Sequence, residues 1–313
     1  MRLWARAPTE LIARVMNASK PSETANLFST ALNAVTVIVV THESAHCLDA
    51  LDGLLSRCAH VIISDNGSAD GTPELARAKW PHAEVLAHGQ NLGFGAANNR
   101  ALTRVSSPLA FLLNPDCEMT EAGLGTLLEA SEADTDLAVL APQLVSVSGK
   151  PEVNYRWPQT LWRSCGAAAS GPVCVGFVCG AAMLLRRSRF DDVGYFDERF
   201  FLYYEDDDLC LRLFEARRPI VVMPDVKAVH HSRGSVRGAR PWRSEFGRGF
   251  HHAQSKLIFA QKHRSDEEAR RLRRWLLFTT ALSIPFRAIV FSPKLLARMV
   301  GRWQGLRRWS AHG

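Results

Sequence analysis

Four consecutive carboxylates, Glu205 to Asp208, form the densest group of reactive side chains in the sequence. They directly follow the apolar and aromatic segment Phe200–Tyr204. At the start of a helix such residues are favoured by the helix dipole, so helix capping is one interpretation. Repulsion within such a run raises pKa values, and a raised pKa suits a general base or a metal site. We therefore predict a chemical role for at least one of the four.

Polar side chains also follow three apolar runs that are predicted to be strands. In an open α/β sheet, ligands bind outside the carboxyl ends of the strands. A single group of this kind is compatible with a simple turn, and Asp65 to Ser68 has turn-forming composition. Three successive groups favour a shared binding site. The groups are Thr41 and Glu43 after residues 35–40, Asp65 and Asn66 after residues 60–64, and Asn114 and Asp116 after residues 109–113.

Asp116 and His230 are candidate ligands of a divalent cation. Asp116 follows an apolar run and a proline that stiffens the turn, and carboxylate oxygens suit Mg²⁺ or Mn²⁺ shared with substrate phosphates. The alternative for Asp116 is the N-cap of a helix that begins near Thr120, although Thr120 itself suits that position. His230 ends a strand-like run, where the alternatives are a structural histidine and a metal ligand.

Short apolar runs alternate with helical patterns in the first half of the chain, which predicts a doubly wound α/β sheet. The runs resemble strands that are buried on both faces of a parallel sheet. In this half the predicted strands are Val35–Val40, His60–Ser64, Glu84–Ala87 and Leu109–Leu113, and the predicted helices are Ala45–Arg57, Pro73–Trp80 and Gly95–Val105. In the second half the predicted strands are Phe177–Arg186, Ile220–Met223 and Lys227–His230, and the predicted helix is Glu205–Arg217.

Composition excludes a disordered or disulfide-stabilised small protein, because the 313 residues are 47% hydrophobic and 22% charged. The net charge of +7 combines two opposed parts. Residues 233–313 carry 18 basic and 4 acidic side chains, whereas residues 1–232 carry 20 basic and 27 acidic ones. This division predicts chemistry in the acidic part and attachment to an anionic partner in the basic part.

The end of the basic part has the pattern of an amphipathic helix. A basic helix with Trp and Leu on one side lies naturally in an anionic membrane interface. Packing on the protein's own core is the alternative, and nucleic acid is disfavoured because no recognition motif is present. The uncharged run Trp275–Phe286 is shorter than the roughly 20 residues that a spanning helix needs. The apolar positions at helical spacing are Leu295, Leu296, Met299, Val300, Trp303 and Leu306.

The ordered set of motifs resembles glycosyltransferase family 2, and within it the rhamnosyltransferase-like members that act on cell-surface polysaccharides. The resemblance covers residues 35–264, and the order of the motifs makes it specific. The motifs of the nucleotide-binding half are Ser64–Thr72, Asn91–Gly95 with Asn98 and Asn99, and Leu113–Asp116. Those of the acceptor half are Cys179–Arg187, Val193–Glu198, Phe201–Leu209, and His230 followed by Ser235.

The resemblance implies a GT-A fold, with a Rossmann-like, mostly parallel sheet flanked by helices, and inverting transfer of a sugar from a nucleoside diphosphate sugar. Asp206 matches the position of the catalytic base, with Asp207 and Asp208 as neighbouring alternatives. Asn114 takes the first position of the family's Asp-x-Asp metal motif, which leaves one anionic ligand fewer. The remaining implied roles are nucleotide binding for Thr41, Glu43, Asp65, Asn91, Gly93, Phe94 and Asn114, acceptor binding for Glu205 and Asp208, and Mg²⁺ or Mn²⁺ binding for Asp116 and His230.

We therefore expect an N-terminal extension at residues 1–33, a GT-A domain at 34–264 and a basic amphipathic helical tail at 265–313. Residues 34–118 are the expected nucleotide-binding half and residues 119–264 the acceptor half. The expected donor is a dTDP- or UDP-linked rhamnose or other hexose. The expected acceptor is a polyprenyl-diphosphate-linked glycan or a polysaccharide.

The basic tail adds an expected anionic membrane surface as a partner and argues for a peripheral enzyme on the cytoplasmic face of the inner or plasma membrane. The seven scattered cysteines, with no Cys-x-x-Cys, agree with reduced thiols there. Two alternative functions are a nucleotidyltransferase and a catalytically silent, membrane-associated protein that binds nucleotide sugars.

Overall fold

The computed structural model describes residues 32–156, 164, 166–231, 241–289 and 292–310. Nearly all of the predicted N-terminal extension lies outside these residues. The chain divides into two compact units. The first unit contains residues 1–92, 97–196 and 209–236, and the second contains residues 93–96, 197–208 and 237–313. The segment that carries the four carboxylates therefore belongs to the same unit as the C-terminal helices.

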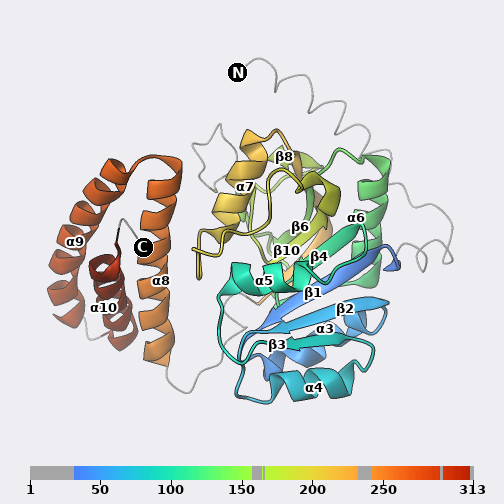
Figure 1. The fold of residues 1–313 in the computed structure, drawn as a ribbon, viewed down its shortest axis with the longest axis horizontal. Helices are drawn as coiled ribbons and strands as arrows, with labels where there is room; N and C mark the ends of the chain where they lie inside the picture. Colours follow the sequence, from blue (N-terminus) through green and yellow to red (C-terminus); the bar gives the residue numbers. More distant parts are fainter. Residues whose placement is uncertain (1–31, 157–163, 165, 232–240, 290–291, 311–313) are drawn as a thin grey trace. The chain divides into compact units, whose positions relative to one another are not determined.

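The described part of the first unit contains a nine-stranded sheet in the order β3-β2-β1-β4-β10-β6-β11-β5, with β8 paired to β11 (Figure 1). Its parallel half, β3-β2-β1-β4, follows the predicted runs closely, and all seven residues of β1 are buried. The strands are β1 (Val35–Thr41), β2 (His60–Asp65), β3 (Glu84–Ala87), β4 (Leu109–Leu113), β5 (Cys117–Met119), β6 (Val139–Val145), β8 (Val173–Val175), β10 (Ala182–Arg186) and β11 (Ile220–His230).

Helices cover and connect these strands, as the alternating pattern predicts. Thr120 is the N-cap of α6, because its side chain accepts a hydrogen bond from the Gly123 amide. The capping alternative for Asp116 is therefore wrong. The helices, of which α5 and α7 continue into the second unit, are η1 (Ala45–Cys47), α3 (Leu48–Leu55), α4 (Thr72–Lys79), α5 (Phe94–Leu102), α6 (Glu121–Ala133), η3 (Arg187–Arg189) and α7 (Glu205–Glu215).

Two strand predictions in the second half of the chain are wrong. The predicted strand Phe177–Arg186 is divided into β9 (Phe177–Val178), which pairs with β7 (Tyr155–Arg156), and β10, which is antiparallel to β4 and β6. Conversely, the two predicted strands at residues 220–223 and 227–230 are one strand, β11. Its pairing with β6 shifts register between Met223 and Lys227, where Pro224 has no amide hydrogen to donate.

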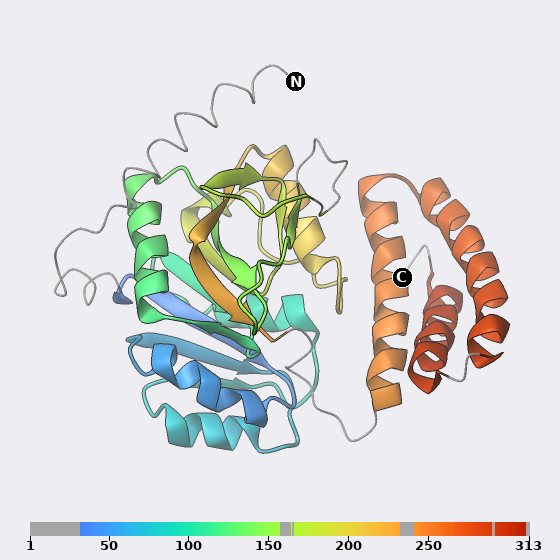
Figure 2. The ribbon, with the colours of Figure 1, turned by 180° about the vertical axis from the view of Figure 1, so that it is seen from behind.

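The second unit contains three helices, α8 (Pro241–His263), α9 (Asp266–Ile289) and α10 (Pro293–Arg308), seen from both sides in Figures 1 and 2. Helices α8 and α10 touch backbone to backbone, because a Cβ at Gly301 would lie 2.0 Å from the Phe246 carbonyl oxygen. Leu257, Leu276 and Leu306 lie in the core of this unit. Met299 and Leu306 of α10 are buried within this unit, as the alternative to an interfacial helix predicts, whereas Leu295 is 41% exposed. Within the described residues, every helix is too short or too polar to cross a membrane.

Candidate active site

Asp65 lies at the carboxyl end of β2 and is held by three hydrogen bonds. Its Oδ1 accepts from the Thr41 hydroxyl at 2.9 Å and from the Ser68 hydroxyl at 2.6 Å, and its Oδ2 accepts from the Ser68 amide at 2.9 Å. Thr41 is buried at the end of the neighbouring strand β1, with which Asp65 is in register. Thr41 therefore positions Asp65, as expected where parallel strands end at one edge of a sheet.

Glu43 holds the loop that follows Asp65. Its backbone has a positive φ of 54°, which is uncommon for a residue other than glycine. Its amide donates to the Ser68 hydroxyl at 2.9 Å, and its Oε1 accepts from the Ala69 amide at 2.8 Å. Backbone strain of this kind persists where surrounding contacts enforce it and is frequent at ligand sites.

Asn66 joins the Asp65 loop to the segment that follows β3. Its Nδ2 donates to Asn91 Oδ1 at 3.0 Å, and its Oδ1 accepts from the Leu92 amide at 2.7 Å. The sequence reading placed Asn66 among the strand-end residues without giving it a role. Its position next to Asp65 is the signal that would have found this bridge.

Asp116 and His230 are brought together from positions 114 residues apart, because β11 pairs with β5 so that His230 is in register with Cys117. Asp116 is buried, and its Oδ1 lies 3.9 Å from His230 Nε2. The other ring nitrogen, Nδ1, lies 3.5 Å from Oε2 of Glu152, a residue that sequence reasoning missed. Glu152 sits in an irregular segment after β6, where no sequence pattern marks it.

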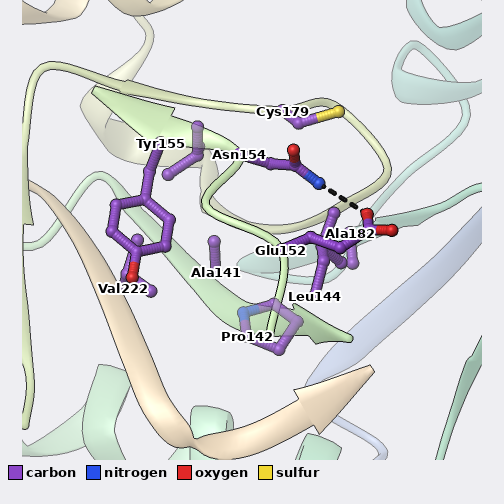
Figure 3. Close-up of a pocket in the computed structure, with 10 residues that line it drawn as sticks. Ala141, Pro142, Leu144, Glu152, Asn154, Tyr155, Cys179, Ala182 and Val222 are labelled. Carbon is purple, nitrogen blue, oxygen red and sulfur yellow. Dashed lines mark hydrogen bonds between the residues drawn. The ribbon is translucent and has the colours of Figure 1, made fainter. Parts of the chain in front are cut away.

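A small pocket lies next to Glu152 (Figure 3). Asn154 Nδ2 donates to Glu152 Oε2 at 3.0 Å, and the Tyr155 hydroxyl donates to Gln143 Oε1 at 3.0 Å. Cys179 also lines this pocket. Among the described residues, no group of three or more His, Cys, Asp or Glu side chains could hold a metal ion. A cation here would therefore take further oxygen ligands from substrate phosphates and water.

Asn114 directly follows β4 and is partly exposed, and its amide donates to the Ala181 carbonyl at 2.8 Å.

Gly93 and Phe94, in contrast, belong to the second unit and contact Phe201. The Phe94 amide donates to the Phe201 carbonyl at 3.1 Å. A Cβ at Gly93, whose φ is +93°, would lie 2.4 Å from that same carbonyl oxygen. Only glycine fits this approach, which explains its place in the motif.

The structure divides the four carboxylates by exposure. Glu205 and Asp208 are buried, whereas Asp206 and Asp207 are partly exposed at the first turn of α7. Tyr203 and Tyr204, directly before this turn, have positive φ values of 70° and 68°. Backbone strain of this kind is frequent at functional sites.

Two side chains of α8 hold Asp208 in place. Its Oδ1 lies 2.6 Å from Lys262 Nζ and 2.7 Å from His263 Nε2, and Lys262 also bonds Asp197 Oδ2 at 2.7 Å. Burial by itself raises the pKa of Asp197, but the hydrogen bonds from Arg199 and Lys262 outweigh it and lower the pKa. Asp208 is fully buried, so in this structure it holds the segment and offers an acceptor no accessible surface.

Glu205 is a buried acid whose Oε2 has no hydrogen-bond partner among the described residues. Burial, and then the neighbouring charge of Asp206, raise its pKa well above the usual value. Glu205 therefore keeps its proton to a higher pH than an ordinary glutamate does.

Comparison with known proteins identifies relatives along most of the chain. A Mycobacterium tuberculosis protein, N-acetylglucosaminyl-diphospho-decaprenol L-rhamnosyltransferase, is 29% identical over 262 residues, covering 72% of this chain and 84% of that protein. The low-salt glycan biosynthesis hexosyltransferase Agl10 of Haloferax volcanii is 26% identical, covering 66% and 70%.

Solved structures agree on the fold. The mannosyltransferase PcManGT of Pyrobaculum calidifontis, solved in complex with GDP-Man and Mn²⁺, superposes with a TM-score of 0.51 at 16% identity, covering 96% of this chain and 93% of that one. The sequence model of the family described as "Glycosyl transferase family 2" matches residues 36–194, about half of the chain. The strand-end polar groups thus sit in a GT-A fold, and the protein belongs to glycosyl transferase family 2.

Proposed function

We propose that this glycosyltransferase moves rhamnose or another hexose, with inversion, from a dTDP- or UDP-linked donor to a polyprenyl-diphosphate-linked or polysaccharide acceptor. The observation that carries the proposal is that Asp65 at the end of β2, Asp116 in the turn after β4 and His230 at the end of β11 all belong to strand ends of one sheet, with Asp116 and His230 paired. The M. tuberculosis relative supports the substrate classes, because its name contains both L-rhamnose and a decaprenol diphosphate acceptor.

Asp65 is the proposed contact of the pyrimidine base, and its neighbours give it a fixed direction. Thr41 and Ser68 occupy Oδ1, and the Ser68 amide occupies one lone pair of Oδ2. An ionised carboxylate accepts about four hydrogen bonds, so Oδ2 retains capacity for the base N–H. Thymine and uracil present the same N–H edge, so Asp65 serves either donor. Glu43, Asn91, Asn114, Gly93 and Phe94 complete the proposed nucleotide-binding set.

Asp116 and His230 fit a divalent cation of the Mg²⁺ or Mn²⁺ class, because a buried carboxylate and an imidazole converge at a strand end. Such an ion, when bound, neutralises the negative charge that develops on the leaving diphosphate. Glu152 would orient the imidazole through Nδ1, as second carboxylates commonly do for metal-binding histidines. Asn114 contributes no charge, so we expect weaker metal affinity than with two aspartates.

Asp206 is the proposed base. The acceptor hydroxyl gives its proton to the Asp206 carboxylate as its oxygen bonds to the anomeric carbon, while the bond from that carbon to the diphosphate oxygen breaks. Of the four carboxylates, only Asp206 and Asp207 are accessible enough to meet a substrate. Glu205 is buried in the first turn of α7, so its proposed part in acceptor binding is to position the Asp206 segment.

Two half-buried cations in the second unit suit the phosphates of the acceptor. Lys256 and Arg302 make no salt bridge to a carboxylate within the described part of the chain. Burial and then the Arg302 charge lower the pKa of Lys256, and burial and then Arg287 lower that of Arg302. A phosphate group would relieve this unfavourable gathering of positive charge.

The experiment measures release of nucleoside diphosphate from a panel of dTDP- and UDP-sugars, with and without a short-chain prenyl-diphosphate N-acetylglucosamine acceptor. Assays with Mn²⁺, with Mg²⁺ and with EDTA test the cation. We expect release that depends on the acceptor, and its loss in Asp206→Asn with donor binding unchanged. Asp207→Asn is the matched control, since it removes the neighbouring accessible carboxylate.

Retained turnover in Asp206→Asn together with loss in Asp207→Asn would move the base by one residue. Donor binding without any release, over the whole panel and with every metal, would indicate a protein that binds nucleotide sugars without transferring them. Formation of a nucleotide sugar from a nucleoside triphosphate would indicate a nucleotidyltransferase instead.

A further inference from the structure

Helix α9 exposes an apolar face of its own. Trp275, Phe278 and Leu282 are 59%, 64% and 62% exposed. Their spacing of three and four residues places all three on one side of the helix. Ala281 and Pro285 are also exposed there. Large exposed apolar side chains are scattered singly on most proteins, so a contiguous set on one helix face indicates a contact surface.

The opposite side of α9 is already used for packing. Ala269, Leu276 and Thr280 are buried, and the Arg273 guanidinium donates to the Leu306 carbonyl at 2.7 Å, which ties α9 to α10. The exposed face is therefore a different side of α9 from the one that packs within the second unit. It is a second apolar side, and soluble helices normally carry polar residues there.

Basic side chains predominate beyond the first turn of α9, which itself contains Asp266, Glu267 and Glu268. Residues 269–313 contain ten basic and no acidic side chains. Arg271 and Arg274 lie on the exposed side of α9, one turn before the aromatic residues. Arg271 contacts Glu267 at 3.4 Å, but both side chains are largely exposed, so this pair is weak.

We propose that the exposed face of α9, from Arg271 to Pro285, docks on the surface of an anionic lipid bilayer. Tryptophan and phenylalanine insert at the level of the headgroups, while arginines beside them contact lipid phosphates. A second copy of this chain fits less well, because the segment from Arg271 to Pro285 carries only basic charges and two such faces would repel each other. This proposal rests on the proposed lipid-linked acceptor for its biological sense, but not for its geometry.

The surface differs from the one that the sequence indicates. The apolar residues Met299 and Leu306 of α10 are buried within the second unit and unavailable to lipid. A helix buried by its own unit and a helix that docks on a membrane share the same amphipathic pattern. Exposure distinguishes them: α10 exposes Leu295, at 41%, whereas α9 exposes three large apolar side chains on one face, which favours α9 as the membrane contact.

The test uses the full chain and co-sedimentation with vesicles of phosphatidylglycerol and phosphatidylethanolamine, compared with pure phosphatidylcholine. We expect binding to the anionic vesicles only. The triple variant Trp275→Ser, Phe278→Ser, Leu282→Ser should bind them at least about tenfold more weakly, because serine removes the apolar side chains that the bilayer surface would bury. The control is Leu75→Ser with Val147→Ser, two exposed apolar residues of the first unit.

Unchanged vesicle binding in the triple variant would overturn the proposal, as would equal losses in the control. A wild-type dimer that the triple variant abolishes, without vesicle binding by either, would show a protein contact instead. Transfer to a water-soluble acceptor separates the two hypotheses. If the triple variant loses vesicle binding but still transfers sugar to the soluble acceptor, the docking proposal and the proposed function both stand. If the wild type binds vesicles but turns over no donor, only the proposed function fails.

Discussion

Lys262→Met tests the contact on which the segment of Asp206 rests. The Lys262 ammonium lies 2.6 Å from Asp208 and 2.7 Å from Asp197, and Asp208 is fully buried. Methionine keeps most of the side-chain length but removes the charge. The substitution therefore removes one positive charge from beside both Asp197 and Asp208.

The expected cost follows from burial. Removing one member of a buried ion pair usually destabilises by about 3–5 kcal/mol, because the remaining charge is left uncompensated. Here His263 still bonds Asp208 and Arg199 still bonds Asp197, so we expect about 2–3 kcal/mol, below that range. Arg264→Met is the matched control. Its pair with Glu268 is exposed and 3.6 Å long, and is worth about 0.5 kcal/mol or less.

The assay is urea denaturation followed by circular dichroism, repeated between pH 7 and pH 3. A lowered pKa means that ionised Asp197 stabilises the folded state above its unfolded pKa of about 4, and that this is lost as pH falls through the folded value. The difference between wild type and Lys262→Met should therefore shrink below about pH 4.

Turnover should also fall in Lys262→Met while donor affinity is retained, because the residues proposed for the base end of the donor lie in the first unit. Equal stability of Lys262→Met and Arg264→Met at pH 7 would refute the reasoning. A difference that does not change with pH would show that the lost contact is packing of the methylene chain and not charge.

Three further predictions concern single groups. Gly93→Ala should destabilise the protein by about 2–4 kcal/mol, because the new Cβ clashes with Phe201 in addition to straining the backbone. Gly89→Ala also has a positive φ but open space around its Cβ, so it should cost about 1 kcal/mol. Equal melting temperatures of the two variants would contradict this prediction. Glu205→Gln should gain stability relative to wild type as pH rises from 4 to 8. In the wild type, the stabilisation that comes from the raised pKa of Glu205 is complete below its unfolded pKa of about 4.3 and is lost as pH rises through its folded pKa, whereas glutamine does not titrate. Parallel pH profiles of the two melting temperatures would count against this prediction. Lys256→Gln should raise the KM for the diphosphate acceptor several-fold and leave the KM for the donor unchanged, and a shift in the donor KM alone would exclude the acceptor role.

The local sequence pattern was sufficient to predict elements whose position is set mainly by burial of apolar side chains. Strands β1, β2 and β4 could be predicted because both of their faces are buried, so most of their residues are apolar. The polar residues after β1, β2 and β4 followed directly, since the ends of parallel strands share one sheet edge. The divided strand at residues 177–186 could not be predicted, because pairing with β7 on one side and β4 on the other is a choice made by distant segments.

The sequence by itself determined the family, the alternating sheet and the identity of the acids, because residue types and their order carry that information. Tertiary structure decided which acids are accessible, that Glu152 meets His230 and that α9 exposes more of its apolar face than α10 does. Each of these depends on what lies across a packed interface, and burial sets both the solvent access and the electrostatics of a side chain. A pattern along one helix shows an apolar side, but only its neighbours decide whether that side is covered.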